Sequence, residues 1–464
     1  MPNSKFVVPV PTNEPILSYS SGSKERQLIK QKLAELKSEV IEIPLIIGGK
    51  EIKTGDMGEC RCPHNHKHVL AKYHQAGDKE ISLTIESALK AQKSWAKMPW
   101  EARISIFLRA AELLSTKYRM LLNASTMLCQ SKNVFQAEID SACELIDFFR
   151  FNAYFAQQIY EQQPNSAKGI WNRVEYRPLE GFVLAITPFN FTSIAGNLPT
   201  APAMMGNTVV WKPGPKAIYS AYFFMKLLIE AGLPDGVINF ILGSPPKIGK
   251  ATLSHPDLTG VHFTGSTKTF HTIWKIIGEN IANYKSYPRI VGETGGKDFI
   301  FVHASADIDS LNTAIIRGAF EYQGQKCSAA SRAYIPNSVW EILEPKLIST
   351  TKELKMGDVE DFSNFINAVI DKNAFDKIVS YIEFAKKAND AEIINGGNYS
   401  DETGYFIEPT IILTDNPKFK TMQEEIFGLV ITIYVYPDDK YEETLHLCDE
   451  TSPYALTGSI FAKD

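Results

Sequence analysis

Residues 181–192 read GFVLAITPFNFT, a short apolar run that ends in a polar turn. An uninterrupted apolar run of this length is typical of a strand that is buried on both faces of a sheet. Further runs of this kind follow at 208–211, 237–242 and 260–263. Amphipathic helices, such as those expected at 217–231 and 268–281, lie between the runs. This alternation predicts an α/β fold built on a parallel sheet with helices on both faces.

The sequence before this stretch is mainly helical. Apolar residues recur every three or four positions within residues 81–160, and a charged helix is expected near 23–40. A long helix is expected from 134 to 160, and we interpret its aromatic stripe as a packing surface. The polar break QQPNS at 162–166 ends this helix, and 171–176 are predicted to form a short strand.

The composition is that of a globular protein with enough residues for about three domains. Of the 464 residues, 44% are hydrophobic and 22% are charged, which is enough for a large core. Acidic residues number 53 and basic residues 48, which excludes a chain-wide basic footprint for nucleic acid. We expect no membrane partner, since no apolar stretch reaches the roughly 18–20 residues of a span. The first five residues, MPNSK, show no apolar core of a signal peptide.

Six cysteines in a chain of this length indicate free thiols in a reducing compartment. Cys327 lies in the segment GQKCSAAS, where small neighbours and Lys326 favour an accessible thiolate. The alternative is a buried, inert thiol. A second cluster, CRCPHNHKH at 60–68, could hold Zn²⁺, because alternating ligands on a strand face one side. Its C-x-C spacing is unlike that of zinc modules, so we expect a surface turn after a strand and no metal site.

Polar or glycine-rich residues follow the predicted strands. Because the carboxyl ends of parallel strands meet at one edge of a sheet, a ligand site is expected there. Each segment alone is ambiguous, since Gly-Ser-Thr before a helix is an N-cap or a phosphate cradle. The chain lacks G-x-G-x-x-G and G-x-S-x-G, which argues against the standard dinucleotide fingerprint and a hydrolase serine site. The segments are TPFNFT at 187–192, KPGP at 212–215, TGST at 264–267 and GETGGK at 292–297.

Taken in order, these segments resemble the aldehyde dehydrogenase superfamily. The motifs that carry the resemblance are TPFNF at 187–191, WKP at 211–213, FTGST at 263–267, ETGGK at 293–297, GQKC at 324–327 and EEIFG at 424–428. Other stretches look like one branch, the pyrroline-5-carboxylate (L-glutamate 5-semialdehyde) dehydrogenases. These stretches are TNEP at 12–15, AEID at 137–140, DFFRFNA at 147–153, QQP at 162–164, EYQGQKCS at 321–328 and VYPDDKY at 435–441.

The resemblance implies an organisation into domains. It implies an NAD-binding domain of residues 1–162 and 181–294, with an N-terminal arm, and an oligomerisation hairpin at 163–180. Residues 295–464 would form an α/β catalytic domain. Family members continue beyond the position of Asp464, so we expect a C-terminally truncated chain that lacks a substrate loop and a final strand. With that strand present, a homodimer or larger homo-oligomer is expected, and a chain that binds nucleotide without turnover is one alternative.

The resemblance also assigns the catalytic roles. The Cys327 thiolate would add to the aldehyde and form a thiohemiacetal, which is later oxidised to a thioester. The Asn190 amide and the Cys327 backbone N–H would stabilise the oxyanion. Glu293 would act as the general base that activates water for thioester hydrolysis.

NAD is the cofactor that the resemblance implies. Lys212 would bind the adenosine ribose, while Glu425 would bind the nicotinamide ribose and Phe427 would pack beside the nicotinamide. Pro215 stands where many family members carry an acid, so NAD over NADP is a preference. The remaining cofactor residues, of which Gly265 and Ser266 would bind the pyrophosphate, are Gly214, Gly265, Ser266, Thr267, Lys268 and Thr269.

The small-molecule substrate would be L-glutamate 5-semialdehyde, with another small aldehyde as the alternative. Lys326 and Ser328 flank the nucleophile and could hold the polar tail of the semialdehyde. Lys326 could equally be an exposed charge that only favours the thiolate. Phe191 and Glu138 complete the expected substrate residues, and a surface carboxylate is the alternative for Glu138. The compartment would be the cytoplasm in a bacterium or the mitochondrial matrix in a eukaryote.

Overall fold

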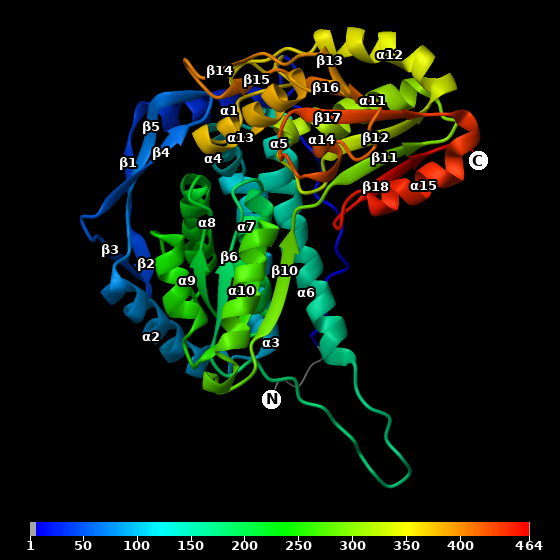
Figure 1. Cartoon of the computed structure of the whole chain (residues 1–464). Coiled ribbons are helices and arrows are strands. Elements are labelled where there is room, and N and C mark those ends of the chain that lie inside the picture. Colours follow the sequence, from blue (N-terminus) through cyan, green and yellow to red (C-terminus); the bar gives the residue numbers. More distant parts are fainter. Residues whose placement is uncertain (1–5, 464) are drawn as a thin grey trace. The chain divides into compact units, whose positions relative to one another are not determined.

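The computed structural model describes residues 6–463, so expectations for MPNSK and Asp464 lie outside the described residues. The chain forms two compact units. The first comprises residues up to 60, 69–129 and 134–293, and the second comprises 61–68, 130–133 and the chain from 294. Each unit has its own large sheet (Figure 1).

The sheet of the first unit has seven strands in the order β10-β9-β6-β7-β8-β2-β3. Strands β9, β6, β7 and β8 are parallel, whereas β2 and β3 extend the edge in antiparallel pairs. These four parallel strands correspond to the four apolar runs of the sequence, so the predicted α/β fold is confirmed. Helices α2 and α7 both pack against β6 and β7. The strands are β2 (Leu45–Ile47), β3 (Lys50–Ile52), β6 (Phe182–Ile186), β7 (Thr208–Lys212), β8 (Ile238–Phe240), β9 (Leu258–Gly265) and β10 (Arg289–Thr294).

The two helices predicted at 217–231 and 268–281 are present as α8 and α10, with bounds that differ from the prediction by at most two residues. Ser23 caps the charged N-terminal helix, as its hydroxyl accepts from the Arg26 N–H. A small sheet, β1-β5-β4, begins in this unit and consists of β1 (Ile41–Ile43), β4 (Met57–Cys62) and β5 (Asn65–His74). The helices outside the long bundle are α1 (Lys24–Ser38), α2 (Asp78–Trp95), α7 (Thr192–Met204), α8 (Ile218–Ala231), α9 (Pro245–Leu253), α10 (Thr267–Glu279) and the 3₁₀ turn η3 (Ile281–Asn283).

The long helix expected at 134–160 is interrupted. Close to its start, Glu138–Glu144 form a π-helical segment, η2, which separates α5 from α6. Such π segments are often found at functional sites. Glu138 and Asp140 on this segment are both buried. The bundle comprises α3 (Trp100–Leu113), π-helical η1 (Leu114–Tyr118), α4 (Arg119–Gln130), α5 (Val134–Ala137), η2 (Glu138–Glu144) and α6 (Leu145–Glu161).

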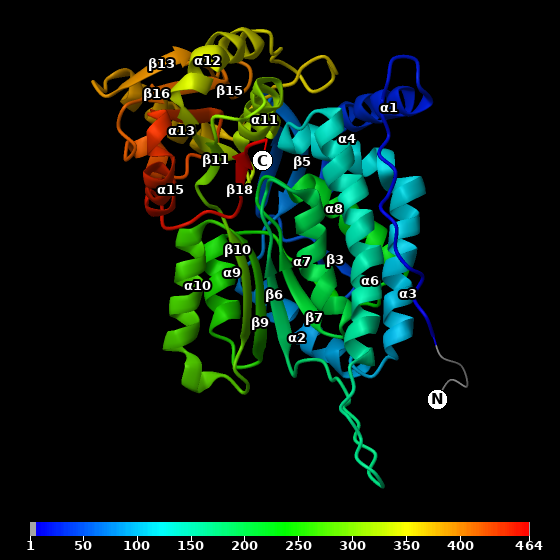
Figure 2. The same ribbon diagram turned by 90° about the vertical axis from the view of Figure 1, so that its right-hand side faces the viewer.

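Residues 162–180 form a projecting loop between α6 and β6 (Figures 1 and 2). The prediction of a strand at 171–176 is wrong, because a side chain replaces the backbone ladder. Gln163 donates from Nε2 to the Val174 carbonyl at 3.2 Å and accepts from the Val174 N–H at 3.0 Å. Asn172 similarly donates to the Asn165 carbonyl at 2.9 Å. The two arms of the loop therefore lie together without being strands.

The sheet of the second unit has six strands in the order β13-β16-β17-β12-β11-β18, of which only β13 is antiparallel to its neighbour. Its core includes the stacked rings of Phe301, Tyr334 and Tyr436. The elements are β11 (Asp298–Val302), α11 (Ile308–Phe320), the 3₁₀ turn η4 (Glu321–Gly324), β12 (Ala330–Pro336), α12 (Asn337–Lys352), α13 (Lys372–Lys386), β13 (Ala391–Asn395), β14 (Tyr399–Ser400), β15 (Phe406–Ile407), β16 (Thr410–Thr414), α14 (Lys420–Gln423), β17 (Val430–Tyr436), η5 (Asp438–Lys440), α15 (Tyr441–Glu450) and β18 (Gly458–Phe461).

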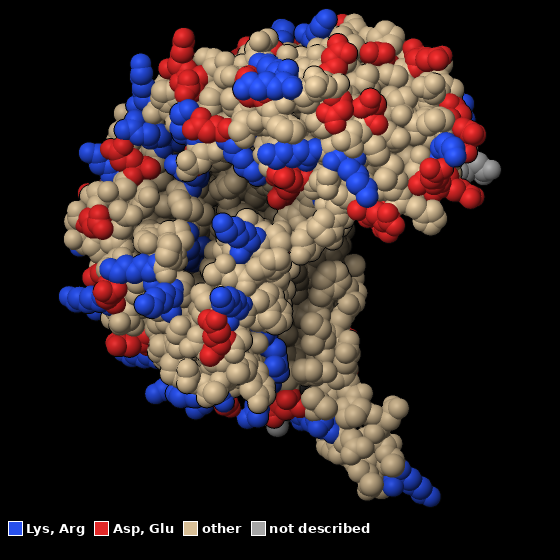
Figure 3. Space-filling model, viewed as in Figure 1, with Lys and Arg blue, Asp and Glu red and all other residues tan. Residues whose placement is uncertain are grey.

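The described residues include no helix that is both long and apolar enough to cross a bilayer. Basic and acidic side chains are intermixed on the face shown in Figure 3. That face therefore presents no single-sign field of the kind that attracts nucleic acid.

Candidate functional site

The loop after β6 is attached to the end of β7. The Thr187 N–H donates to the Lys212 carbonyl at 3.2 Å, and the Trp211 indole donates to the Thr187 hydroxyl at 3.1 Å. Gly214 lies so close to this loop that a Cβ there would be 2.9 Å from the Pro188 carbonyl carbon. The segments TPFNF and WKPG, which the sequence singled out separately, are thus packed together.

A buried carboxylate fixes the other end of the loop. Asp140 on η2 accepts the first amides of α7, from Thr192 at 3.0 Å and Ser193 at 2.9 Å. The loop residues Asn190, which is buried, and Phe191, which is half-buried, lie directly before this helix. Asp140 therefore positions the loop, a role that no spacing in the sequence indicates. Its sequence signal is its place in the stretch AEID at 137–140, which carries part of the resemblance but indicates no role for Asp140.

Lys212 ends β7 and is buried, with 5% of its surface exposed. Its ammonium donates to the Pro213 carbonyl at 3.1 Å. Burial penalises the charged form and lowers the pKa of Lys212 to about 8. A desolvated ammonium with donors beyond the one given to Pro213 fits a ligand with hydroxyl groups.

The turn between β9 and α10 is compatible with both interpretations of its Gly-Ser-Thr segment, a helix N-cap and a phosphate cradle. Ser266 is the N-cap of α10, since its hydroxyl accepts from the Thr269 N–H at 3.3 Å. The first turn of this helix holds no acidic residue, and a helix N-terminus of this kind suits phosphate groups. Thr267 is half-buried, whereas Lys268 and Thr269 are exposed. Gly265 stands beside the Phe263 ring, 2.8 Å from where a Cβ would lie.

In the second unit, Glu425 lies against the segment ETGGK. Its carboxylate accepts from the Gly296 N–H at 3.1 Å, and a Cβ on Gly295 would be 1.8 Å from it. Burial raises the pKa of Glu425, an effect that Lys377 and the Gly296 hydrogen bond partly oppose. Lys377 also donates to the Glu425 carbonyl at 2.9 Å. Two of the predicted motifs therefore meet at this carboxylate.

Cys327 follows a tight turn at the end of α11. It is partly exposed, whereas the other five cysteines, which are also free thiols, are buried. Gly324 in this turn packs against the next motif, since a Cβ there would be 2.2 Å from the Gly428 carbonyl oxygen. Phe427, beside Gly428, is half-buried and has a left-handed backbone with φ of 63°. The nucleophile loop and the EEIFG segment are thus packed together.

The residues that flank Cys327 differ in their surroundings. Lys326 forms an ion pair with Glu321 at 2.9 Å, and Glu321 also binds Arg317. Burial disfavours ionised Glu321, but Lys326 and Arg317 outweigh it and lower the pKa of the carboxyl group. Ser328 is exposed. Because Lys326 is paired and largely buried, its description as a simple exposed charge is wrong.

The predicted site residues fall into two sets, one in each unit. The first unit holds Asn190, Phe191, Lys212, Gly214, Gly265, Ser266, Thr267, Lys268, Thr269 and Glu138, together with Glu293, which is half-buried on β10. The second unit holds Lys326, Cys327, Ser328, Glu425 and Phe427. Within each unit, the structure brings together motifs that are far apart in the sequence.

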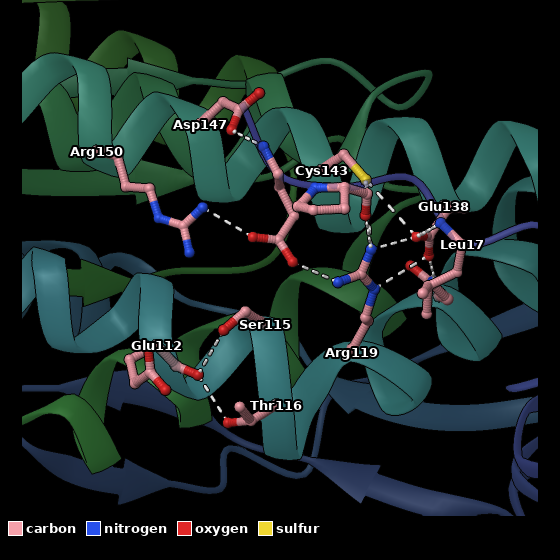
Figure 4. Close-up of polar contacts among 12 residues, drawn as sticks. Leu17, Glu112, Ser115, Thr116, Arg119, Glu138, Cys143, Asp147 and Arg150 are labelled. Atoms are coloured by element: carbon pink, nitrogen blue, oxygen red, sulfur yellow. Dashed lines mark hydrogen bonds and ion pairs between the residues drawn. The ribbon is translucent and has the colours of Figure 1, made fainter. Parts of the chain in front are cut away.

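Glu138 is fully buried, so the alternative of a surface carboxylate is wrong. It pairs with Arg119, which also binds Glu14 at 2.6 Å (Figure 4). It also accepts from the Leu17 N–H at 2.8 Å and the Tyr19 hydroxyl at 2.7 Å. Burial opposes ionisation of Glu138, but these donors outweigh it and lower the pKa of its carboxyl group. The contacts described tie the N-terminal arm to η2.

The segment CRCPHNHKH is a packing element of the structure. The expected turn after a strand is present at 63–64, directly after β4, but its expected place on the surface is wrong, because Cys60, Cys62 and His64 are buried. His64 pairs through Nδ1 with the Ser131 hydroxyl at 3.2 Å, and His66 bonds the Asp401 carbonyl at 2.8 Å. Residues 6–463 contain no group of three or more His, Cys, Asp or Glu side chains arranged to hold a metal ion.

Comparison with known proteins gives a family match. The model of the aldehyde dehydrogenase family matches residues 52–464. The mitochondrial delta-1-pyrroline-5-carboxylate dehydrogenase of Dictyostelium discoideum is 54% identical over 459 residues, which cover 98% of this chain and 82% of that protein. The human protein of the same name is 46% identical, with 97% of this chain and 80% of that protein covered.

A solved structure agrees with these relatives. The delta-pyrroline-5-carboxylate dehydrogenase of Mycobacterium tuberculosis, in a crystal structure bound with NAD, is 50% identical to this chain. The two superpose with a TM-score of 0.96, covering 100% of this chain and 85% of the other.

Proposed function

Because the chain belongs to the aldehyde dehydrogenase family, we propose that it oxidises L-glutamate 5-semialdehyde, the open form of pyrroline-5-carboxylate, to L-glutamate with NAD. The names of its relatives support this activity, which belongs to proline degradation. The observation that carries the proposal is Cys327, the one partly exposed thiol of the six, on a turn that Gly324 packs against Gly428.

The reaction begins with the Cys327 thiolate. Its sulfur adds to the aldehyde carbon, and the carbonyl oxygen becomes the oxyanion of a thiohemiacetal. The Asn190 amide and the Cys327 N–H donate to this oxyanion, and one such donor is typically worth about 3–4 kcal/mol. Asp140 holds the loop that carries Asn190, since it binds the amides of Thr192 and Ser193.

The residues present fit NAD. Lys212, buried and with donors to spare beyond the Pro213 carbonyl, suits ribose hydroxyls, and the amides at the start of α10 suit a pyrophosphate. The Glu425 carboxylate would be an acceptor for the second ribose, and Phe427 would lie beside the nicotinamide. When bound, NAD supplies the hydride acceptor that oxidises the thiohemiacetal to a thioester.

Hydrolysis completes the cycle. The Glu293 carboxylate takes a proton from water as the water oxygen attacks the thioester carbon. The carbon–sulfur bond then breaks, glutamate leaves and the thiolate is restored. Lys326, Ser328 and Phe191 orient the semialdehyde. Glu138 contributes by holding the arm and η2, because its carboxylate faces donors of the protein on every described contact.

Residues 1–162 and 181–294 form the NAD-binding domain, residues 295–464 form the catalytic domain with the nucleophile, and 163–180 contact a second copy of the chain. The compartment is the mitochondrial matrix in a eukaryotic source, in agreement with the names of several relatives, or the cytoplasm in a bacterial source.

The test is NADH formation from purified protein, NAD and the semialdehyde. Cys327→Ser should abolish turnover while NAD binding remains, because serine is a far weaker nucleophile at neutral pH. Cys448→Ser, which alters a buried thiol on α15, is the matched control and should retain activity. Turnover that survives in Cys327→Ser would overturn the nucleophile. A higher kcat/KM for a simple aliphatic aldehyde than for the semialdehyde would favour a different substrate.

A further inference from the structure

We infer that Gln323 is a positioning residue, whose side-chain amide holds the turn that places Cys327. This inference rests on the proposed role of Cys327 as the nucleophile. Gln323 lies on η4, between the end of α11 and the nucleophile, and only 1% of its surface is exposed.

The turn has an unfavourable backbone. Tyr322 has φ 48° and ψ 42°, Gln323 has φ 56° and ψ 28°, and Gly324 has φ 65°. Glycine adopts this left-handed conformation freely, but residues with a Cβ do not. Two such residues in succession persist only where surrounding contacts over-determine the conformation, and such strain clusters at functional sites.

The Gln323 side chain supplies those contacts. Its Nε2 donates to the Ser131 carbonyl at 3.0 Å and to the Ala368 carbonyl at 2.9 Å. Its Oε1 accepts from the Asn367 N–H at 3.1 Å. Both amide hydrogens and the carbonyl oxygen are therefore bound to backbone groups. With all three of these bonds made, the Gln323 amide can take only one orientation. The side chain therefore restrains the backbone of Gln323 itself.

The groups that bind Gln323 are themselves fixed. The Ser131 hydroxyl accepts from the Ala368 N–H at 3.2 Å and pairs with buried His64. Next to Ser131, the Lys132 ammonium lies 4.3 Å from the centroid of the Tyr322 ring, a cation–π contact with the other strained residue. Gln325 accepts from the Ile370 N–H at 2.9 Å. The nucleophile loop is thus held by segments 130–133 and 367–370, far from it in sequence.

A movement of this turn would move two parts of the site. Cys327 follows the turn directly, and Gly324 packs against the carbonyl of Gly428, the residue after Phe427. Relaxation of Tyr322 or Gln323 to an ordinary backbone would shift both the thiol and the EEIFG segment. We therefore expect loss of the Gln323 amide to affect the rate of chemistry more than the binding of NAD by Lys212 and α10.

Gln323→Glu tests this inference, because it keeps the shape but replaces the donating NH₂ by oxygen. Asn239→Asp is the matched control. Asn239 is fully buried, donates to the Gly236 carbonyl at 2.8 Å and accepts from the Gly48 N–H at 2.9 Å, all within the first unit. Gln323→Met, which keeps the volume without polar atoms, provides a second variant if Gln323→Glu does not fold. The full chain is used throughout.

Three quantities are measured: Tm, the split between kcat and KM, and the rate of Cys327 alkylation by iodoacetamide as a function of pH. We expect both substitutions to lower Tm. Only the Gln323 variants should lower kcat, by about tenfold or more, with an unchanged KM for NAD and a displaced alkylation profile. Gln323 variants that match Asn239→Asp in kcat and alkylation would overturn the inference.

Alkylation also separates this inference from the proposed function. Turnover that survives in Cys327→Ser, combined with a displaced alkylation profile in Gln323→Glu, would overturn the nucleophile assignment but uphold the placement of the loop. An unchanged profile, combined with inactive Cys327→Ser, would uphold the nucleophile and overturn the role of Gln323.

Discussion

At the scale of single residues, the titration of Lys212 offers a test of cofactor binding. Its pKa is lowered by burial to about 8. Below that pH the side chain is a cation with two donors for ribose hydroxyls beyond the one given to the Pro213 carbonyl, and above it the side chain is a neutral amine. Because binding favours the protonated form, NAD affinity should fall as the pH rises through about 8.

Lys212→Met should remove that pH dependence and weaken NAD binding by about ten- to a hundredfold, the range for one hydrogen bond to a charged group. Calorimetric titration with NAD on both sides of this pH measures both effects. Lys226→Met, which alters an exposed lysine on α8, is the control and should bind NAD normally. If NAD affinity still falls with rising pH in Lys212→Met, the pH dependence belongs to another titrating group.

The sequence singles out residues whose proposed chemistry requires a particular residue type and a particular order along the chain. Cys327 could be singled out because a small-residue segment with a neighbouring lysine is typical of a reactive thiol. Gln323 and Asp140 could not, because their roles depend on Ser131 and Thr192, which lie far away along the chain. Ion pairing of Lys326 was also missed, since Glu321 gives no signal in the sequence.

At the scale of elements, the contacts of η2 determine how the N-terminal arm is attached. Glu138→Ala would leave buried Arg119 without one of its partners, and breaking a buried pair typically costs about 3–5 kcal/mol. We therefore expect faster hydrogen exchange at the Leu17 amide, which donates to Glu138, and a lower free energy of unfolding. Exchange measured by mass spectrometry and urea titration report these two quantities.

Glu35→Ala provides the comparison. It breaks an exposed pair with Lys32 on α1, which should cost less than about 1 kcal/mol. Equal losses in the two variants would show that the Glu138 cluster contributes no more than a surface pair.

The predicted strands and helices were largely correct where apolar periodicity determines them. Strands β6 to β9 coincide with continuous apolar runs. A short run of this kind is typical of a strand buried on both faces of a sheet, so its secondary structure could be predicted. The π segment η2 was missed, because its buried carboxylates are stabilised by partners such as Arg119 and the Thr192 amide. The prediction of a strand at 171–176 is wrong because the Gln163 side chain makes the bonds that a strand partner would make, and a local sequence pattern cannot distinguish the two.

At the scale of the whole molecule, the projecting loop 162–180 predicts self-association. Trp171 is 85% exposed and Ile170 60% exposed. Exposed apolar groups gathered on one segment are typical of an interface. We expect Trp171→Glu to reduce the molar mass measured by light scattering at micromolar concentration. Ile342→Glu, at an exposed apolar position on α12, should not. Equal masses for both variants and the unaltered chain would assign association to another surface.

Membership of residues 130–133 in the second unit has a consequence for synthesis on the ribosome. Ser131 is translated long before Gln323. The Ser131 carbonyl therefore cannot accept its hydrogen bond from Gln323 until the later residue has been synthesised. A fragment that begins at residue 294 would lack Ser131, and the Gln323 amide would lose one of its acceptors. The nucleophile half expressed by itself would therefore keep the Gln323 bonds to Ala368 and Asn367 but would hold the turn less firmly.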